Sequence, residues 1–292
     1  MPPKKVNSYK FLREKWSTRH VELQKSLFKK HKDSVDWLTK NSKQLALGSL
    51  SGLMILASPV KGPVDSQVKV ASESVQKIDN RYFVISDLAK ALPAEVRPLT
   101  SEEESTISSL LTKEYGLSVS AAVGNLRLNR SYGLIGQEQH LAVYPGDNMG
   151  SHFDNPEDSA QYARQGMAPG LGAWGYFATS PANVTQEDID REKYYIAVQT
   201  FLSPDFNEKV AQYRDFYKYK KMLVVNPQNG KAVVADIADA GPAEWTGKHL
   251  GGSPEVMTYL ERQDGRARGP VLYFFIDDPS DNVPLGPIQS IQ

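Results

Sequence analysis

The chain contains no cysteine among its 292 residues. Disulfide bonds, thiolate metal ligands and cysteine nucleophiles are therefore excluded. This absence leaves the compartment open, because exported bacterial domains without cysteine are possible. The chain also has no net charge, since 34 basic residues balance 34 acidic ones. A uniformly basic protein of the kind that binds nucleic acids is excluded, and we expect no nucleic-acid partner.

The balanced total hides a strong asymmetry along the chain. Residues 1–43 contain twelve Lys or Arg and four Asp or Glu, so the remainder has 22 basic and 30 acidic residues. The first segment thus carries a charge of +8 and the rest −8. Apolar residues recur near helical spacing from Tyr9 to Leu27, with basic residues between them, which predicts a basic, cytoplasmic amphipathic helix within residues 1–43.

A long hydrophobic run is also missing. The uncharged run at residues 45–60, between Lys43 and Lys61, is slightly shorter than the roughly 20 apolar residues that span a bilayer. The basic side should stay cytoplasmic. Because no clear small-x-small cleavage site is present, the sequence favours an uncleaved signal anchor at residues 44–60 over a removed signal peptide. We expect a single-pass protein of the cell membrane, with a stalk at residues 61–80 and the rest extracytoplasmic. The alternative is a buried core helix.

Beyond the stalk we expect a helical or mixed subdomain at residues 81–168. The sequence Ser101-Glu102-Glu103-Glu104 has the pattern of a capping box, with acidic residues at the positive end of the helix dipole. Ile107, Leu110 and Leu111 follow on one face of the predicted helix. Further on, Ser253-Pro254-Glu255 reads as the N-cap, first-turn proline and first-turn acid of a short helix that ends at Leu260.

Residues 220–242 form the most informative stretch, which predicts a β-hairpin that ends in a carboxylate. Two valine-rich runs flank Pro227-Gln228-Asn229-Gly230, and Asn-Gly supplies the positive φ angles of a tight turn. Strict alternation in the second run places Ile237 and Asp239 on one face and Asp236 on the other. A carboxylate at the end of an apolar face lies at the mouth of a barrel or sheet, where it can be partly desolvated and still meet a ligand.

The hairpin, its Asn-Gly-Lys turn and the following Asp239-Ala240-Gly241-Pro242 resemble the core of the double-psi β-barrel in RlpA-like lytic transglycosylases and their expansin relatives. The resemblance covers roughly Gly170 to Asp277. It implies a double-psi-like β-barrel domain at residues 169–292 with Asp239 as the catalytic acid. Two family positions differ, because an aspartate is replaced near Gly251 and a histidine has no counterpart around residues 197–200. Most of the chain also resembles an uncharacterised group of membrane-anchored bacterial proteins with Gln-His-Leu and Gly-Gly-Ser-Pro-Glu-Val-Met motifs, which supplies no function.

Aromatic residues beside glycine-rich turns are typical of a polysaccharide-facing groove. Trp174 and Tyr176 lie in one such segment, and Trp245 lies in another. Core packing is the alternative for each tryptophan, since large aromatic side chains dominate buried cores. His249 and Ser253 belong to the segment that corresponds to the family's helix entry. We expect these substrate-binding residues to contact a glycan, while helix capping explains Ser253 equally well.

A second group of chemically versatile residues precedes the predicted barrel. His140 and His152 occur within seventeen residues together with Glu138, Asp147 and Asp154. Such residues can assemble a metal site. No pair has the i, i+4 spacing of a helical zinc motif, so capping and loop hydrogen bonds are favoured over a metal. We expect no cofactor.

Together these patterns predict an α+β protein, in which the N-terminal amphipathic helix and one membrane-anchor helix precede a double-psi-like β-barrel with flanking helices. The expected function is binding or remodelling of peptidoglycan. Lytic transglycosylation is the reaction considered, because it can proceed with one carboxylic acid. The alternatives are a non-catalytic envelope scaffold, in which Asp239 only caps its turn, and a metal-dependent hydrolase that uses His140, His152 and nearby acids. The sequence leaves the oligomeric state open.

Overall fold

The computed structural model describes residues 81–262 and 269–291. The predicted amphipathic helix (1–43), signal anchor (44–60) and stalk (61–80) lie outside the described residues. Among the residues that are described, no helix is both long enough and apolar enough to cross a membrane. The described part falls within one compact unit, residues 76–292.

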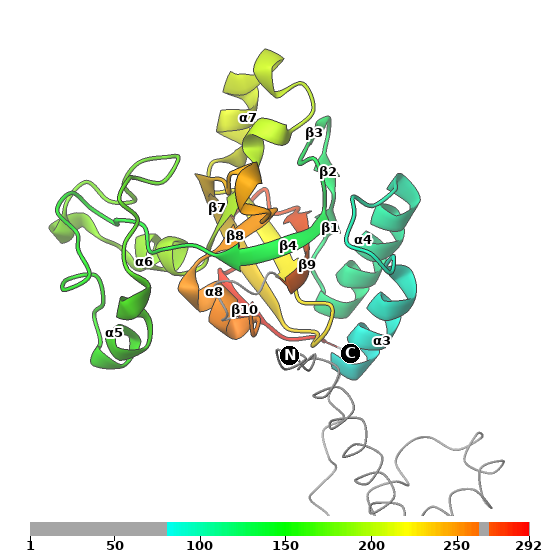
Figure 1. Cartoon of the computed structure of the whole chain (residues 1–292), viewed down its shortest axis with the longest axis horizontal. Coiled ribbons are helices and arrows are strands. Elements are labelled where there is room, and N and C mark those ends of the chain that lie inside the picture. Colours follow the sequence, from blue (N-terminus) through cyan, green and yellow to red (C-terminus); the bar gives the residue numbers. More distant parts are fainter. Residues whose placement is uncertain (1–80, 263–268, 292) are drawn as a thin grey trace, which may run out of the picture. The chain divides into compact units, whose positions relative to one another are not determined.

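The centre of this unit is a closed, mixed β-barrel of six strands (Figure 1). Its strands are β4 (Tyr132–Gln137), β5 (Tyr195–Val198), β6 (Lys221–Val225), β7 (Ala232–Ala240), β8 (Leu250–Gly252) and β9 (Gly269–Ile276). Around the barrel the order is β9-β4-β8-β5-β7-β6, and β6 closes it by pairing with β9. The pairs β4–β8 and β5–β7 are parallel and the other four are antiparallel. The α+β class and the barrel in the C-terminal region are thus confirmed.

Short strands extend this sheet. β1 (Val119–Ser120) pairs with β9, and β10 (Gly286–Ile288) pairs with β7. β2 (Ala122–Val123) and β3 (Leu126–Arg127) form a separate small hairpin. The barrel draws on a wider part of the chain than residues 169–292, because β4 lies upstream of that range.

The helices surround the barrel on different sides. They are α3 (Arg81–Ala91), α4 (Ser101–Tyr115), α5 (Pro156–Tyr162), α6 (Gln186–Lys193), α7 (Val210–Tyr217) and α8 (Pro254–Tyr259). Single turns of 3₁₀ helix are η3 (Ala163–Gln165), η4 (Pro181–Asn183), η5 (Thr200–Leu202), η6 (Phe206–Glu208) and η7 (Glu244–Thr246). Figure 1 shows α3 and α4 on one side of the barrel and α5 and α6 on the opposite side.

Alternation along the strands builds two apolar layers. Val233, Ala235 and Ile237 of β7 belong to the interior cluster, with Ile135, Ile196 and Phe275 from other strands. The residues between them face outward, so that Val234, Leu223 and Phe274 pack against α3 and α4. Both faces of β6, β7 and β9 are therefore buried, which explains why these strands are nearly continuous runs of apolar residues.

Local sequence signals account for the elements that were expected. The hairpin forms as predicted, with β6 and β7 antiparallel and Gly230 at a φ of 65° in the connecting turn. The predicted helix at residue 101 is present, but its capping box begins one residue earlier, at Thr100, and is completed by Glu103. Ser253 caps α8 by accepting a hydrogen bond from the Val256 amide, and Pro254 occupies the first turn.

Candidate functional site

The carboxylate of Asp239 does not continue the interior row of β7. The register between β5 and β7 shifts at this point, so that Ile196 is paired with Ile237 but Ala197 is paired with Asp239. Ala238 is therefore the extra residue of a β-bulge. Ile196 and Val198 belong to the interior cluster whereas Ala197 does not. The bulge thus places Asp239 on the outer side of the barrel wall, which differs from the strict alternation expected from the sequence.

Asp239 is half-buried and anchored by backbone donors. Its Oδ1 accepts hydrogen bonds from the amides of Ala173, at 2.9 Å, and Ala240, at 2.8 Å. Burial raises the pKa of Asp239, while these two hydrogen bonds oppose the shift and the nearby Glu138 carboxylate adds to it. The side chain can therefore hold a proton more readily than an exposed aspartate. It also ties the segment at Ala173 to the end of β7, which is the structural role left open by the sequence.

The five expected glycan contacts differ in how accessible they are. Trp245, on η7, is 89% exposed, and Tyr176 is 38% exposed. Trp174 is partly buried, and its indole Nε1 donates to the carbonyl of Ile237 at 2.9 Å. His249 uses Nδ1 to accept the amide of Leu134 at 3.0 Å. Ser253 is fully buried.

Ser253 has two internal hydrogen bonds. Its hydroxyl donates to the carbonyl of Lys193 at 2.7 Å and accepts the amide of Val256 at 3.2 Å. The capping alternative therefore describes its contacts. Trp245 remains the expected contact with the largest accessible surface.

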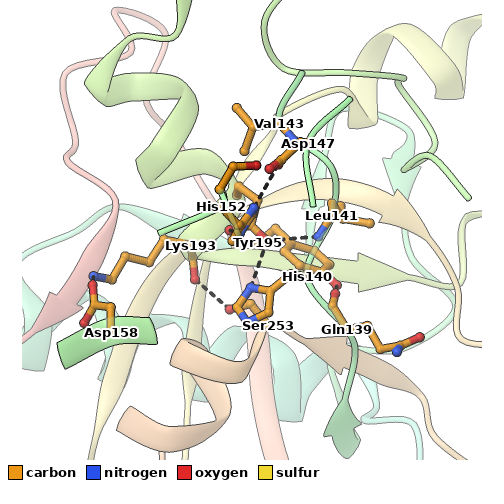
Figure 2. Close-up of polar contacts among 12 residues, drawn as sticks. Gln139, His140, Leu141, Val143, Asp147, His152, Asp158, Lys193, Tyr195 and Ser253 are labelled. Carbon is orange, nitrogen blue, oxygen red and sulfur yellow. Dashed lines mark hydrogen bonds and ion pairs between the residues drawn. The ribbon is translucent and has the colours of Figure 1, made fainter. Parts of the chain in front are cut away.

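Two histidines and two acids form a cluster, to which α6 contributes Glu192; His140, His152 and Asp147 are seen in Figure 2. His140 Nδ1 is 3.2 Å from Glu192 Oε1, and His152 Nε2 is 3.1 Å from Glu192 Oε2. His152 Nδ1 is 2.9 Å from Asp147 Oδ2. All four side chains are almost fully buried. The structure thus brings together the histidines that the sequence singled out and adds Glu192.

The backbone holds this cluster in place. His140 is fixed on both sides by hydrogen bonds that pair it with the 166–168 segment. Glu192 Oε1 accepts the amide of Leu141 at 2.9 Å, and Asp147 Oδ2 accepts the amide of Val143 at 2.9 Å. The Phe153 ring packs edge-on against both imidazoles.

Electrostatic coupling inside the cluster is strong. Burial by itself would raise the pKa of Glu192, but hydrogen bonds and attraction from the two histidines outweigh it and lower the pKa. Burial would lower the pKa of His152, but Glu192 and Asp147 raise it to about 9. Burial of Glu255, together with the nearby negative charge of Glu192, raises the pKa of Glu255 to about 7.

A third place of interest is a cavity of about 250 Å³ that Asp236 lines with Arg191, Tyr219 and Lys221. Asp236 is fully buried, and neither of its side-chain oxygens has a hydrogen-bond partner among the described residues. Burial raises the pKa of Asp236 well above its usual value, although Arg191 opposes the shift with Nε 3.9 Å from Oδ2. Strand alternation placed Asp236 on the face opposite Asp239 and suggested no function for it.

Comparison with known proteins adds no homologue. A scan against protein-family models, a search of curated proteins and a search of solved structures each gave no match. The chain is therefore assigned to no family. The structure itself establishes the six-stranded mixed β-barrel.

Proposed function

We propose that the barrel binds a glycan of the bacterial cell envelope, peptidoglycan, at the end of β7. The observation that carries this proposal is the half-buried Asp239 carboxyl, whose pKa is raised by desolvation. An acid of this kind suits general acid catalysis, because it retains a proton near neutral pH better than an exposed carboxylate. The exposed Trp245 follows six residues later and offers an apolar ring face to a sugar.

The barrel topology supports the same proposal. Two parallel strand pairs within a closed six-stranded barrel agree with the double-psi-like arrangement that the Asp-Ala-Gly-Pro segment suggests. In this proposal residues 45–60 anchor the protein in the cell membrane and the barrel lies on the outer side, where peptidoglycan is found.

A lytic transglycosylase needs only one such acid. The carboxylic acid donates its proton to the glycosidic oxygen while the bond from that oxygen to the anomeric carbon breaks. A hydroxyl of the same sugar then attacks the anomeric carbon and gives its proton to the carboxylate, which restores the acid. The product is an anhydro-sugar, and water is not consumed. Asp239 is the residue proposed for both steps.

Asp239→Asn tests the chemistry, because it keeps the shape of the side chain and removes the titratable proton. The full-length protein is incubated with purified sacculi, and bound protein and released anhydro-sugars are measured. We expect the variant to bind sacculi and to release no product. Asp236→Asn, on the same strand and lining the cavity with Arg191, is the matched control and should release product like the wild type.

Four other outcomes are informative. Wild-type protein that binds sacculi without releasing any product would establish the non-catalytic binding module. Release by Asp239→Asn at the wild-type rate would remove Asp239 from the mechanism. Loss of folding in Asp239→Asn, detected by circular dichroism, would assign the carboxylate to anchoring the segment at Ala173. Wild-type protein without affinity for sacculi would refute the proposal as a whole.

A further inference from the structure

We propose that His140, His152 and Glu192 form a binding site for one divalent transition-metal ion of the zinc type. The proposal is independent of glycan binding at Asp239. One ligand atom from each residue lies within 4.8 Å of the other two. Two imidazoles and one carboxylate are a donor set that proteins use for zinc when one coordination position is left for water or substrate.

The spacing of the ligand atoms fits a metal polyhedron. Zinc bonds of about 2.0–2.2 Å to nitrogen and oxygen in a tetrahedron place neighbouring ligand atoms about 3.3 Å apart. His140 Nδ1 and His152 Nε2 are 3.2 Å and 3.1 Å from the nearer oxygens of Glu192. The two rings also lie side by side, with their centroids 5.0 Å apart. These two distances run to the two different oxygens of Glu192, so an ion between the three side chains would draw together ligand atoms that lie within 4.8 Å of one another.

The surrounding groups orient the three ligands as metal sites require. Asp147 Oδ2 contacts Nδ1 of His152 at 2.9 Å, which directs Nε2 of that ring toward Glu192. A carboxylate behind a coordinating histidine fixes the tautomer and strengthens the ligand. The amide of Leu141 similarly holds Oε1 of Glu192. His140, Asp147 and His152 lie close together in Figure 2, and Glu192 comes from the last turn of α6.

Burial and charge favour an ion over hydrogen bonding alone. The carboxylates of Asp147, Glu192 and Glu255 are all nearly excluded from solvent. Buried acids of one sign require compensation, by protons, by basic side chains or by a metal ion. His140 is completely buried, and its Nε2 has no hydrogen-bond partner among the described residues. In the proposed site this ring coordinates through Nδ1, the nitrogen that faces Glu192.

The site opens to a cavity. His152, Glu192 and Glu255 line a pocket of about 300 Å³, together with Phe153 and Tyr194. A water molecule or a small oxygen-containing ligand from this pocket can occupy the remaining coordination position. Glu255 lines the same pocket and adds a second carboxyl beside Glu192.

The first experiment uses full-length wild-type protein stripped with a chelator and then titrated with Zn²⁺ alone. We expect one equivalent of bound zinc, measured by elemental analysis after gel filtration. Replacing zinc with Co²⁺ should give visible absorption typical of four or five ligands. Hydrogen exchange with zinc present should slow in residues 138–155 and 186–195, which locates the site without any substitution. Absence of stoichiometric zinc, or protection that excludes both segments, would overturn the proposal.

The second experiment removes ligands one at a time. Glu192→Gln and His152→Ala should lose the zinc equivalent. Asp147→Asn, which alters the group behind a ligand, should weaken affinity by about 10–100-fold. His31→Ala is the matched control and should bind like the wild type. Equal zinc binding by Glu192→Gln and the wild type would refute the assignment, while loss of zinc in His31→Ala would place the site elsewhere. If the substitutions prevent folding, the exchange data on the wild type decide.

Discussion

Asp236 makes the stability of this protein depend on pH in a direction opposite to that of most aspartates. Its side chain is 1% exposed, and its pKa is raised well above the usual value by burial. The folded state therefore retains a proton that the unfolded chain releases. The contribution of this proton to stability is complete below the unfolded pKa of about 3.9 and is lost as the pH rises toward the folded pKa.

The magnitude follows from linkage. Between the two pKa values each pH unit costs the wild type about 1.4 kcal/mol relative to a variant that cannot titrate. For a folded pKa above this window, the expected loss from pH 4.5 to 5.5 is about 1.2 kcal/mol, slightly less than the full amount because the unfolded side chain is still partly protonated at pH 4.5. Asp236→Asn keeps the shape and removes the titration. Shifts in other groups cancel when the two proteins are compared at the same pH.

Urea denaturation of both proteins at pH 4.5 and 5.5 measures this difference. We expect the free energy of unfolding of the wild type, minus that of Asp236→Asn, to fall by about 1.2 kcal/mol over the unit. Asp215→Asn, at an exposed position, controls for the loss of one negative charge. If Asp236 is instead ionised and paired with Arg191, 3.9 Å away, the difference will stay constant or rise with pH, which would refute the reasoning.

Other predictions concern packing, recognition and topology. Leu111 is fully buried between α4 and the barrel, so Leu111→Ala should lower the free energy of unfolding by about 2–5 kcal/mol. Leu110 is only partly buried, and Leu110→Ala should lower it by less. Equal losses in urea denaturation would contradict this packing. Trp245→Ala, at an 89% exposed position, should change stability by less than about 0.5 kcal/mol and weaken binding to sacculi, and undiminished binding would exclude this ring from the glycan contact. Protease added to intact spheroplasts should digest the chain beyond Lys61 and spare the basic N-terminal segment, and protection of the large domain would reverse the proposed orientation.

Elements with a local cause were predictable from the sequence. The hairpin of β6 and β7 needs only the two valine-rich runs and the Asn-Gly turn between them. Ser253 and Pro254 start α8 because a capping hydroxyl and a first-turn proline act within a few residues. Closure of the barrel could not be predicted from local sequence patterns. It depends on pairs such as β4–β9, whose register is set by packing between strands more than a hundred residues apart.

The histidine cluster shows the same limit at the level of a site. His140 and His152 drew attention because they are close in sequence, and their spacing argued against a metal. Glu192 completes the cluster from α6, separated from His140 by 52 residues and from His152 by 40. Helical spacing rules apply only when two ligands share one helix. Here a loop and a helix end supply the side chains of the cluster, so a rule for two ligands on one helix says nothing about this geometry.

Asp236 and Asp239 show how one extra residue changes the chemistry of a strand. Strict alternation would place them on opposite faces, with Asp239 on the apolar face at the mouth of the barrel. The bulge at Ala238 places Asp239 on the outer side of the barrel wall. The side chains of Arg191 and Tyr219 lie beside Asp236 and help to cover it. Burial consequently raises the pKa of both acids, more strongly for Asp236. The more desolvated acid is therefore Asp236, for which the sequence suggested no function. The two acids have different neighbours. Substituting each one separately can therefore distinguish a carboxyl proton used in catalysis from one that only affects stability.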